Sequence, residues 1–140
     1  MKTWILDTGP LVAYLDAKDA AHQEVAARLD TFDGELVTTS AVINEAMHFV
    51  GEAPGGPRLL AEYVAASGLR VYDLSAASDL RDAATLMEKY ADTPMDYADA
   101  TLLLLAEALE LGDILTLDRR GFSVFRTRRR HRLTLVLDSA

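Results

Sequence analysis

The sequence predicts an α/β fold in which helices cover both faces of a mainly parallel sheet. Short apolar runs rich in β-forming residues alternate along the chain with longer segments of helical periodicity, the pattern of parallel strands joined by right-handed crossovers. Half of the 140 residues are hydrophobic, which is enough for a substantial core. Because no internal repeat, low-complexity segment or linker interrupts the chain, we expect residues 1–140 to form one domain.

The first third of the chain is expected to contain two strands, each followed by helix. The run Thr3–Leu6 is nearly all apolar, as a central strand buried on both faces would be. Gly9 and Pro10 then turn the chain into a helix, and Ser40 can cap the helix after the second strand. The expected elements are strands at Thr3–Leu6 and Leu36–Thr39 and helices over about Leu11–Asp16, about Ala20–Phe32 and from Ser40 onward.

The rest of the chain continues the alternation of helices and strands. Thr93 and Pro94 are predicted to begin a long helix, because a hydroxyl can cap its free N–H groups and proline suits the first turn. Gly68 and Gly112 are predicted to end helices, Gly112 as a left-handed cap. The expected helices are Arg58–Ser67, Ser78–Tyr90 and Thr93 to about Leu111, and the expected strands are Leu69–Tyr72, Ile114–Leu117 and Phe122–Phe125, with Leu133–Leu137 as a further candidate.

The composition excludes several classes of protein. There is no cysteine, so disulfides, thiolate metal sites and cysteine nucleophiles are excluded. No apolar run approaches the length of a membrane span, and Asp7, Gly9 and Pro10 break the N-terminal run where a signal peptide would continue. We therefore expect a soluble cytoplasmic protein.

The net charge of −8 is unevenly distributed along the chain. Residues 119–140 carry seven arginines and a single acidic residue, so the acidic excess belongs to the first 118 residues. These arginines are Arg119, Arg120, Arg126, Arg128, Arg129, Arg130 and Arg132. Arginine binds phosphate well, so we predict contact with RNA or a partner, although a solubility patch or a site for an acidic partner has the same composition.

Acidic side chains occur where strands end and helices begin. Asp7 and Asp118 each directly follow an apolar strand, and Glu45 lies just over one turn into the helix after the second strand. Asp96 and Asp99 are three residues apart, so they project from one side of a first helical turn. Asp96 near a helix start and Glu45 on a helix surface also have ordinary explanations. In a parallel sheet, however, all five positions fall at the edge where binding sites form.

A cluster of carboxylates raises the pKa of its members and is unstable without cations. An all-oxygen ligand set favours Mg²⁺ or Mn²⁺ over Zn²⁺, and two such ions can activate water for in-line displacement at a phosphodiester. The sequence therefore indicates hydrolysis of a nucleic-acid backbone. Thr8 and Thr116 lie beside Asp7 and Asp118 and could orient a ligand carboxylate or a water, although Thr116 also fits an ordinary strand position.

Three stretches together resemble the PIN-domain family, and within it the VapC-type toxins. They are ILDTGPLVAYLD at the start, TTSAVINEAMHF in the middle and MDYADATLLLLAEALELGDILTLDRRGFSVFR near the end. The resemblance covers essentially the whole chain. It implies a three-layer sandwich around a five-stranded parallel sheet in the order 3-2-1-4-5, and Mg²⁺- or Mn²⁺-dependent endoribonuclease activity.

The resemblance also assigns roles to single residues. Asp7, Glu45, Asp99 and Asp118 match the four acids that such proteins use for catalysis and metal binding. Asp96 matches an additional acidic position and is expected to be an auxiliary ligand. Gly121 stands where the family often has aspartate, which we expect to alter a loop and leave the site intact. A homodimer, a cognate VapB-type antitoxin and an RNA substrate are also implied.

Two other functions compete with this interpretation. A PIN fold could bind RNA or a protein partner without catalysis, although the complete set of acids argues against that. An aspartate after the first strand also occurs in haloacid-dehalogenase-like phosphotransferases. That class needs a second aspartate two residues later, where this chain has Gly9.

Overall fold

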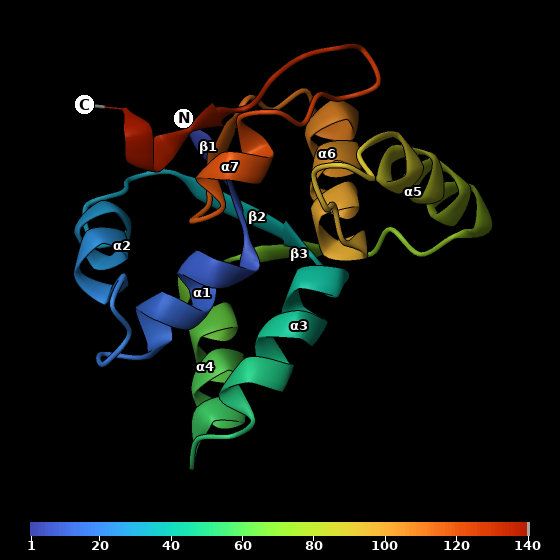
Figure 1. Ribbon diagram of the computed structural model, residues 1–140. Coiled ribbons are helices and arrows are strands. Elements are labelled where there is room, and N and C mark those ends of the chain that lie inside the picture. Colours follow the sequence, from blue (N-terminus) through green and yellow to red (C-terminus); the bar gives the residue numbers. More distant parts are fainter. Residues whose placement is uncertain (140) are drawn as a thin grey trace.

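A computed structural model describes residues 1–139 and shows five parallel strands flanked by helices (Figure 1). The strands are β1 (Thr3–Leu6), β2 (Glu35–Thr39), β3 (Arg70–Tyr72), β4 (Asp113–Leu115) and β5 (Thr134–Leu135). Their order is β3-β2-β1-β4-β5, and each neighbouring pair is parallel. Ile5 of β1 pairs with Val37 on one side and Ile114 on the other, so β1 is central. The α/β class and the strand order are confirmed.

The helices form two layers on the sheet. They are α1 (Thr8–Leu15), α2 (His22–Leu29), α3 (Ser40–Val50), α4 (Gly56–Ser67), α5 (Ala77–Lys89), α6 (Tyr97–Leu109) and the short α7 (Arg119–Phe122), followed by a 3₁₀ turn at Val136–Asp138. In Figure 1, α1 and α2 lie on one side of the strands, and α5 and α6 lie on the other. Among residues 1–139, no helix combines the length and the apolar character needed to cross a membrane.

Helix α6 is the most deeply buried helix. Every residue from Ala100 to Ala106 is buried, and α6 packs against α5, α3 and β2. A helix in this position needs apolar residues on all of its faces, which the run of four leucines Leu102–Leu105 provides. Because strands and helices alternate in direction, this placement brings the N-terminal end of α6 to the carboxyl edge of the sheet.

The predicted strand Phe122–Phe125 is wrong. Phe122 ends the helix α7, and the fifth strand, Thr134–Leu135, lies within the alternative segment Leu133–Leu137. Phe122 and Phe125 are both fully buried, and their rings pack edge to face with centroids 5.2 Å apart. A spacing of three residues brings both rings to one side of a helical turn, whereas a strand would direct them to opposite faces.

Three predicted helix ends are also wrong. Helix α6 begins after Asp96, which is its N-cap, and not at Thr93 and Pro94. Its C-cap is Glu110, which adopts the left-handed conformation with φ of 54° in place of Gly112. The side chain that caps α3 is Thr39, one residue before the predicted Ser40. In each case a neighbouring residue takes the capping role, which composition alone does not decide.

Candidate functional site

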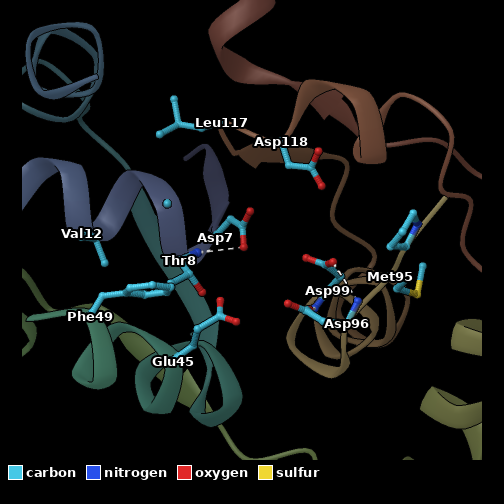
Figure 2. A pocket seen from close by; sticks show the side chains of 12 residues that line it. Asp7, Thr8, Val12, Glu45, Phe49, Met95, Asp96, Asp99, Leu117 and Asp118 are labelled. Carbon is cyan, nitrogen blue, oxygen red and sulfur yellow. Dashed lines mark hydrogen bonds between the residues drawn. The ribbon is translucent and has the colours of Figure 1, made fainter. Parts of the chain in front are cut away.

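Five acidic side chains line one cavity of about 700 Å³ at the carboxyl edge of the sheet. They are Asp7, Glu45, Asp96, Asp99 and Asp118, the same five acids that the sequence singles out. Figure 2 shows their carboxylates facing a common space. Asp7 follows β1, Glu45 comes from α3, the pair Asp96 and Asp99 from the start of α6, and Asp118 from the start of α7. Four distant segments of the chain thus meet here.

Asp7 is the most rigidly held of these acids. Its side chain is only 7% exposed, and it accepts hydrogen bonds from the Thr8 N–H at 2.8 Å and from the Thr116 hydroxyl at 2.7 Å. Burial raises the pKa of Asp7 to about 6, against the lowering effect of these two hydrogen bonds. The carboxylate is therefore oriented but poorly solvated.

Thr116 connects two of the acids. Its fully buried hydroxyl donates to Asp7 Oδ2 and accepts a hydrogen bond from the Asp118 backbone N–H at 3.0 Å. The hydroxyl therefore has both a donor and an acceptor role, which fixes its proton toward Asp7. Thr116 directly follows β4 and is not the ordinary strand residue that the sequence also allows, because it connects Asp7 with Asp118.

Asp96 and Asp99 form a reciprocal cap at the start of α6. The Asp99 N–H donates to Asp96 Oδ1 at 2.8 Å, and the Asp96 N–H donates to Asp99 Oδ2 at 3.1 Å. Such a capping box is a normal helix start and requires no further function. Burial, followed by the charges of Asp96 and Asp7, nevertheless raises the pKa of Asp99 to about 8. Helix capping alone does not explain why an acid lies where its ionisation is so unfavourable.

Asp118 is exposed and caps α7 by accepting from the Gly121 N–H at 2.9 Å. A Cβ atom at residue 121 would lie 2.3 Å from Asp118 Oδ2 and 3.0 Å from the Phe125 ring. No side chain fits there unless the carboxylate moves. Gly121, the one departure from the expected family pattern, therefore leaves room for Asp118 in its present position.

Glu45 and Thr8 lie next to one another on one side of the cavity in Figure 2. Burial raises the pKa of Glu45, and the negative charge of Asp96 adds to this effect. The Thr8 hydroxyl is buried and lies close enough to Glu45 to oppose this rise in pKa, yet it makes no hydrogen bond of good geometry with residues 1–139. A buried hydroxyl without a partner is unfavourable, so this site suits a bound water or another polar ligand.

The cavity offers the ligand chemistry of a hard divalent cation. All of its charged groups are carboxylates, and a positive ion would relieve the repulsion that raises the pKa values of Asp7 and Asp99. Within residues 1–139, no three acids are already placed to hold one ion together. This spacing is compatible with Mg²⁺, which keeps several water ligands and is commonly held by one or two carboxylates.

None of the seven arginines lines this cavity. Arg119 pairs with Glu24 at 2.9 Å and with Asp138 at 2.7 Å, and Arg128 pairs with Asp82 and Glu107. Residues 126–132 lead into β5, which is parallel to β4, so this loop lies at the edge of the sheet opposite the acids. Contact of these arginines with RNA or a partner stays a prediction, and the loop cannot act beside the acids.

Sequence reasoning missed a buried threonine pair that connects α6 to Thr39, the last residue of β2 and the N-cap of α3. The hydroxyls of Thr39 and Thr101 lie 2.8 Å apart, and both side chains are at most 1% exposed. Thr101 donates to the Ala98 carbonyl at 2.7 Å, so the proton between the pair must come from Thr39, which in turn accepts from the Val42 N–H. A threonine at the head of an all-apolar run was the signal that a buried partner exists.

This pair joins the helices that carry Glu45 and Asp99, so replacing Thr101 by valine is expected to loosen the site. The Thr39 hydroxyl would be left buried with no acceptor, which lowers the free energy of unfolding by about 1–3 kcal/mol. Urea unfolding measures this loss. Thr85→Val is the matched control, because Thr85 donates to the Arg81 carbonyl on the exposed face of α5. Equal stabilities of the two variants would contradict the assigned role.

Comparison with known proteins adds a family match to this geometry. A family model described as the PIN domain matches residues 4–127. The chain is similar to "Ribonuclease VapC26" of Mycobacterium tuberculosis (strain ATCC 25618 / H37Rv), with 33% identity over 134 residues that cover 94% of this chain and 98% of that protein.

Two solved structures share the fold. One is Mycobacterium tuberculosis VapC20, described as a sarcin–ricin loop cleaving toxin, with a TM-score of 0.77 and 16% identity over 85% of this chain and 92% of that chain. The other is VapBC2 from Rickettsia felis bound to a DNA fragment from their promoter, with a TM-score of 0.64 and 16% identity over 95% of this chain and 96% of that chain. At these identities the likeness establishes a common architecture.

Proposed function

We propose, since the chain belongs to the PIN-domain family and to its VapC-type group, that it is a divalent-metal-dependent endoribonuclease and the toxin of a toxin–antitoxin pair. The observation that carries the proposal is the meeting of Asp7, Glu45, Asp96, Asp99 and Asp118 at one cavity. The name of the 33% identical relative, a ribonuclease, supports the reaction class. The reaction is the hydrolysis of an RNA phosphodiester bond by water.

Asp7, Glu45, Asp99 and Asp118 are the proposed catalytic and metal-binding residues, with Asp96 as an auxiliary ligand. Mg²⁺ or Mn²⁺, when bound, lowers the pKa of a coordinated water and neutralises charge on the phosphate. The protein contributes the placement of the acids. Thr116 orients Asp7, and the Thr8 hydroxyl is available to bind water beside Glu45. Both threonines thus support the acids without binding the metal themselves.

The proposed partners are RNA, a VapB-type antitoxin and a second copy of the chain. A second cavity, of about 610 Å³ and largely apolar, adjoins the acids and includes Val12, Phe49 and Leu59. Phe49 is 56% exposed and lines both cavities, so an apolar segment of an antitoxin could cover it and reach the acids. We place the protein in the cytoplasm, where messenger, ribosomal and transfer RNA are found. The exposed arginines of the loop 126–132 are proposed to contact RNA away from the cut.

A cleavage assay on structured RNA tests the proposal. The purified chain is expected to cut RNA with Mn²⁺ or Mg²⁺ and to stop when EDTA removes the ion, because the crowded carboxylates need a cation to bind phosphate. RNA binding that needs no metal and leads to no cleavage would instead indicate a binding module. A phosphoaspartate at Asp7 would indicate a phosphotransferase.

A further inference from the structure

Beside the five acids lies another cavity, of about 470 Å³, that the proposed reaction does not use. It shares Glu45 and Asp96 with the acid-lined cavity, so a ligand can extend from one into the other. Its remaining lining comes from the start of α3, the loop after β3 and the start of α6, namely Ser40, Ala41, Asn44, Asp73, Ser75, Tyr97 and Ala98. We call these seven residues the Asp73 subsite.

Asp73 is held in a fixed orientation within the subsite. Its Oδ1 atom accepts hydrogen bonds from the Ser75 hydroxyl at 2.7 Å and from the Ser40 hydroxyl at 3.2 Å. Its Oδ2 atom has no hydrogen-bond partner among residues 1–139. Asp73 takes part in no ion pair there either. An oriented carboxylate oxygen is therefore free to accept a hydrogen bond from a ligand.

Two further groups complete the subsite. The exposed Asn44 amide makes no hydrogen bond with the described residues, so both its donor and its acceptor atoms are available. Tyr97 is half-buried, and its hydroxyl donates to the Leu74 carbonyl at 2.8 Å, which fixes the position of its ring at the cavity. The subsite thus combines an oriented acceptor, a versatile amide and an anchored aromatic ring.

We propose that the Asp73 subsite binds an unpaired nucleobase next to the scissile phosphate, and that Asp73 selects bases carrying an amino group. The proposal rests on the proposed ribonuclease function. Cytosine, adenine and guanine each offer an exocyclic amino donor to a carboxylate, whereas the only base donor of uracil in RNA is its N3–H, which lies between two carbonyl oxygens that a carboxylate repels. Proteins read RNA sequence mainly through unstacked bases, which they stack on aromatic rings and bind through polar side chains.

The position of the subsite explains why a base would enter it. With the phosphate at the acids, an adjacent nucleotide passes Glu45 and Asp96 and reaches Asn44 and Asp73. The two hydroxyls that bind Asp73 Oδ1 leave Oδ2 for the incoming amino group. Binding of a base there requires no ion and no chemical step, so it can be measured apart from cleavage.

Titration with uncharged nucleosides tests the subsite directly. In ¹H–¹⁵N NMR spectra of the whole chain in EDTA, cytidine is expected to shift the side-chain amide signals of Asn44 and the backbone signal of Ser75. From these shifts, cytidine is expected to bind about tenfold more tightly than uridine. Asp73→Asn is expected to remove this preference, whereas Asp33→Asn, an exposed aspartate before β2 at the opposite edge, is expected to retain it.

Each outcome of the titration decides the proposal. Equal shifts by cytidine and uridine, shifts confined to other residues, or an unchanged preference in Asp73→Asn would overturn it. Mg²⁺ alone shifting the Ser75 backbone signal, with that shift lost in Asp73→Asn, would assign the subsite to a cation and also overturn it. Absence of RNA cleavage would refute the proposed function while leaving this binding result standing. If RNA is cleaved, substrates that differ in the single base beside the cut are expected to show the same preference for an amino-bearing base over uracil in kcat/KM. The Asp73→Asn variant is expected to lose that preference.

Discussion

Replacing Asp99 by asparagine is expected to lower the rate of RNA cleavage by about a thousandfold, with the fold retained. The amide oxygen of asparagine can still accept the Asp96 N–H, so the capping of α6 persists. What is lost is a negative charge in the acid-lined cavity, where Asp99 lies near Asp96 and Asp7. Cleavage of one RNA at saturating Mn²⁺ measures the effect, and circular dichroism checks the fold.

Asp79→Asn is a matched control for this substitution. Asp79 occupies the same capping position in α5, where it accepts the Ala76 N–H at 3.2 Å, but it does not line the cavity. The control is expected to cleave RNA at nearly the rate of the unchanged protein. If both variants lost activity equally, capping and not the position of the charge would be responsible. Full activity of Asp99→Asn would remove Asp99 from the proposed catalytic set.

Without divalent cations, the free energy of unfolding is expected to fall as the pH rises from about 5 to 8. The folded pKa values of Asp7, about 6, and Asp99, about 8, both lie above the value of about 3.9 in an unfolded chain. The folded protein therefore binds more protons in this range, so stability is lost as each folded pKa is passed. The expected loss is a few kcal/mol, on the order of 1.4 kcal/mol for each unit of pKa shift.

Urea unfolding in EDTA at several pH values measures this dependence. Asp99→Asn is expected to flatten the curve between pH 6.5 and 8, since the substituted residue cannot ionise. Mn²⁺ is expected to restore stability mainly at pH 8, where the carboxylates are charged. A flat curve for the unchanged protein, or the same slope in Asp99→Asn, would show that these carboxyl groups are well solvated and independent.

The central part of the fold and the acid positions follow from strong local patterns. Thr3–Leu6 and Ile114–Leu115 are apolar enough to be central strands, and Asp7 and Asp118 follow at the edge that parallel topology defines. Glu45, Asp96 and Asp99 share this edge because the helices that carry them begin there. Two expectations stay predictions: that residues 1–140 form one domain, and that the five acids bind metal.

The remaining features depend on contacts between distant residues. The segment from Phe122 to Phe125 fits a strand as well as a helical turn by its local pattern. Only the burial of both phenylalanine side chains against the same side shows that it is a helical turn. The Thr39–Thr101 hydrogen bond joins residues that are 62 positions apart, which no local pattern reports. The arginines could be counted in the sequence, but their loop could be located only once β5 was assigned.

The most direct measurement is the calorimetric titration of the purified chain with Mn²⁺. We expect saturable binding of Mn²⁺ at the cavity formed by Asp7, Glu45, Asp96, Asp99 and Asp118. Asp7→Asn and Asp99→Asn are each expected to weaken this binding by about tenfold or more, and Asp79→Asn is expected to leave it unchanged. If Mn²⁺ bound equally well to all four proteins, or to none of them, the acids would not be a metal centre.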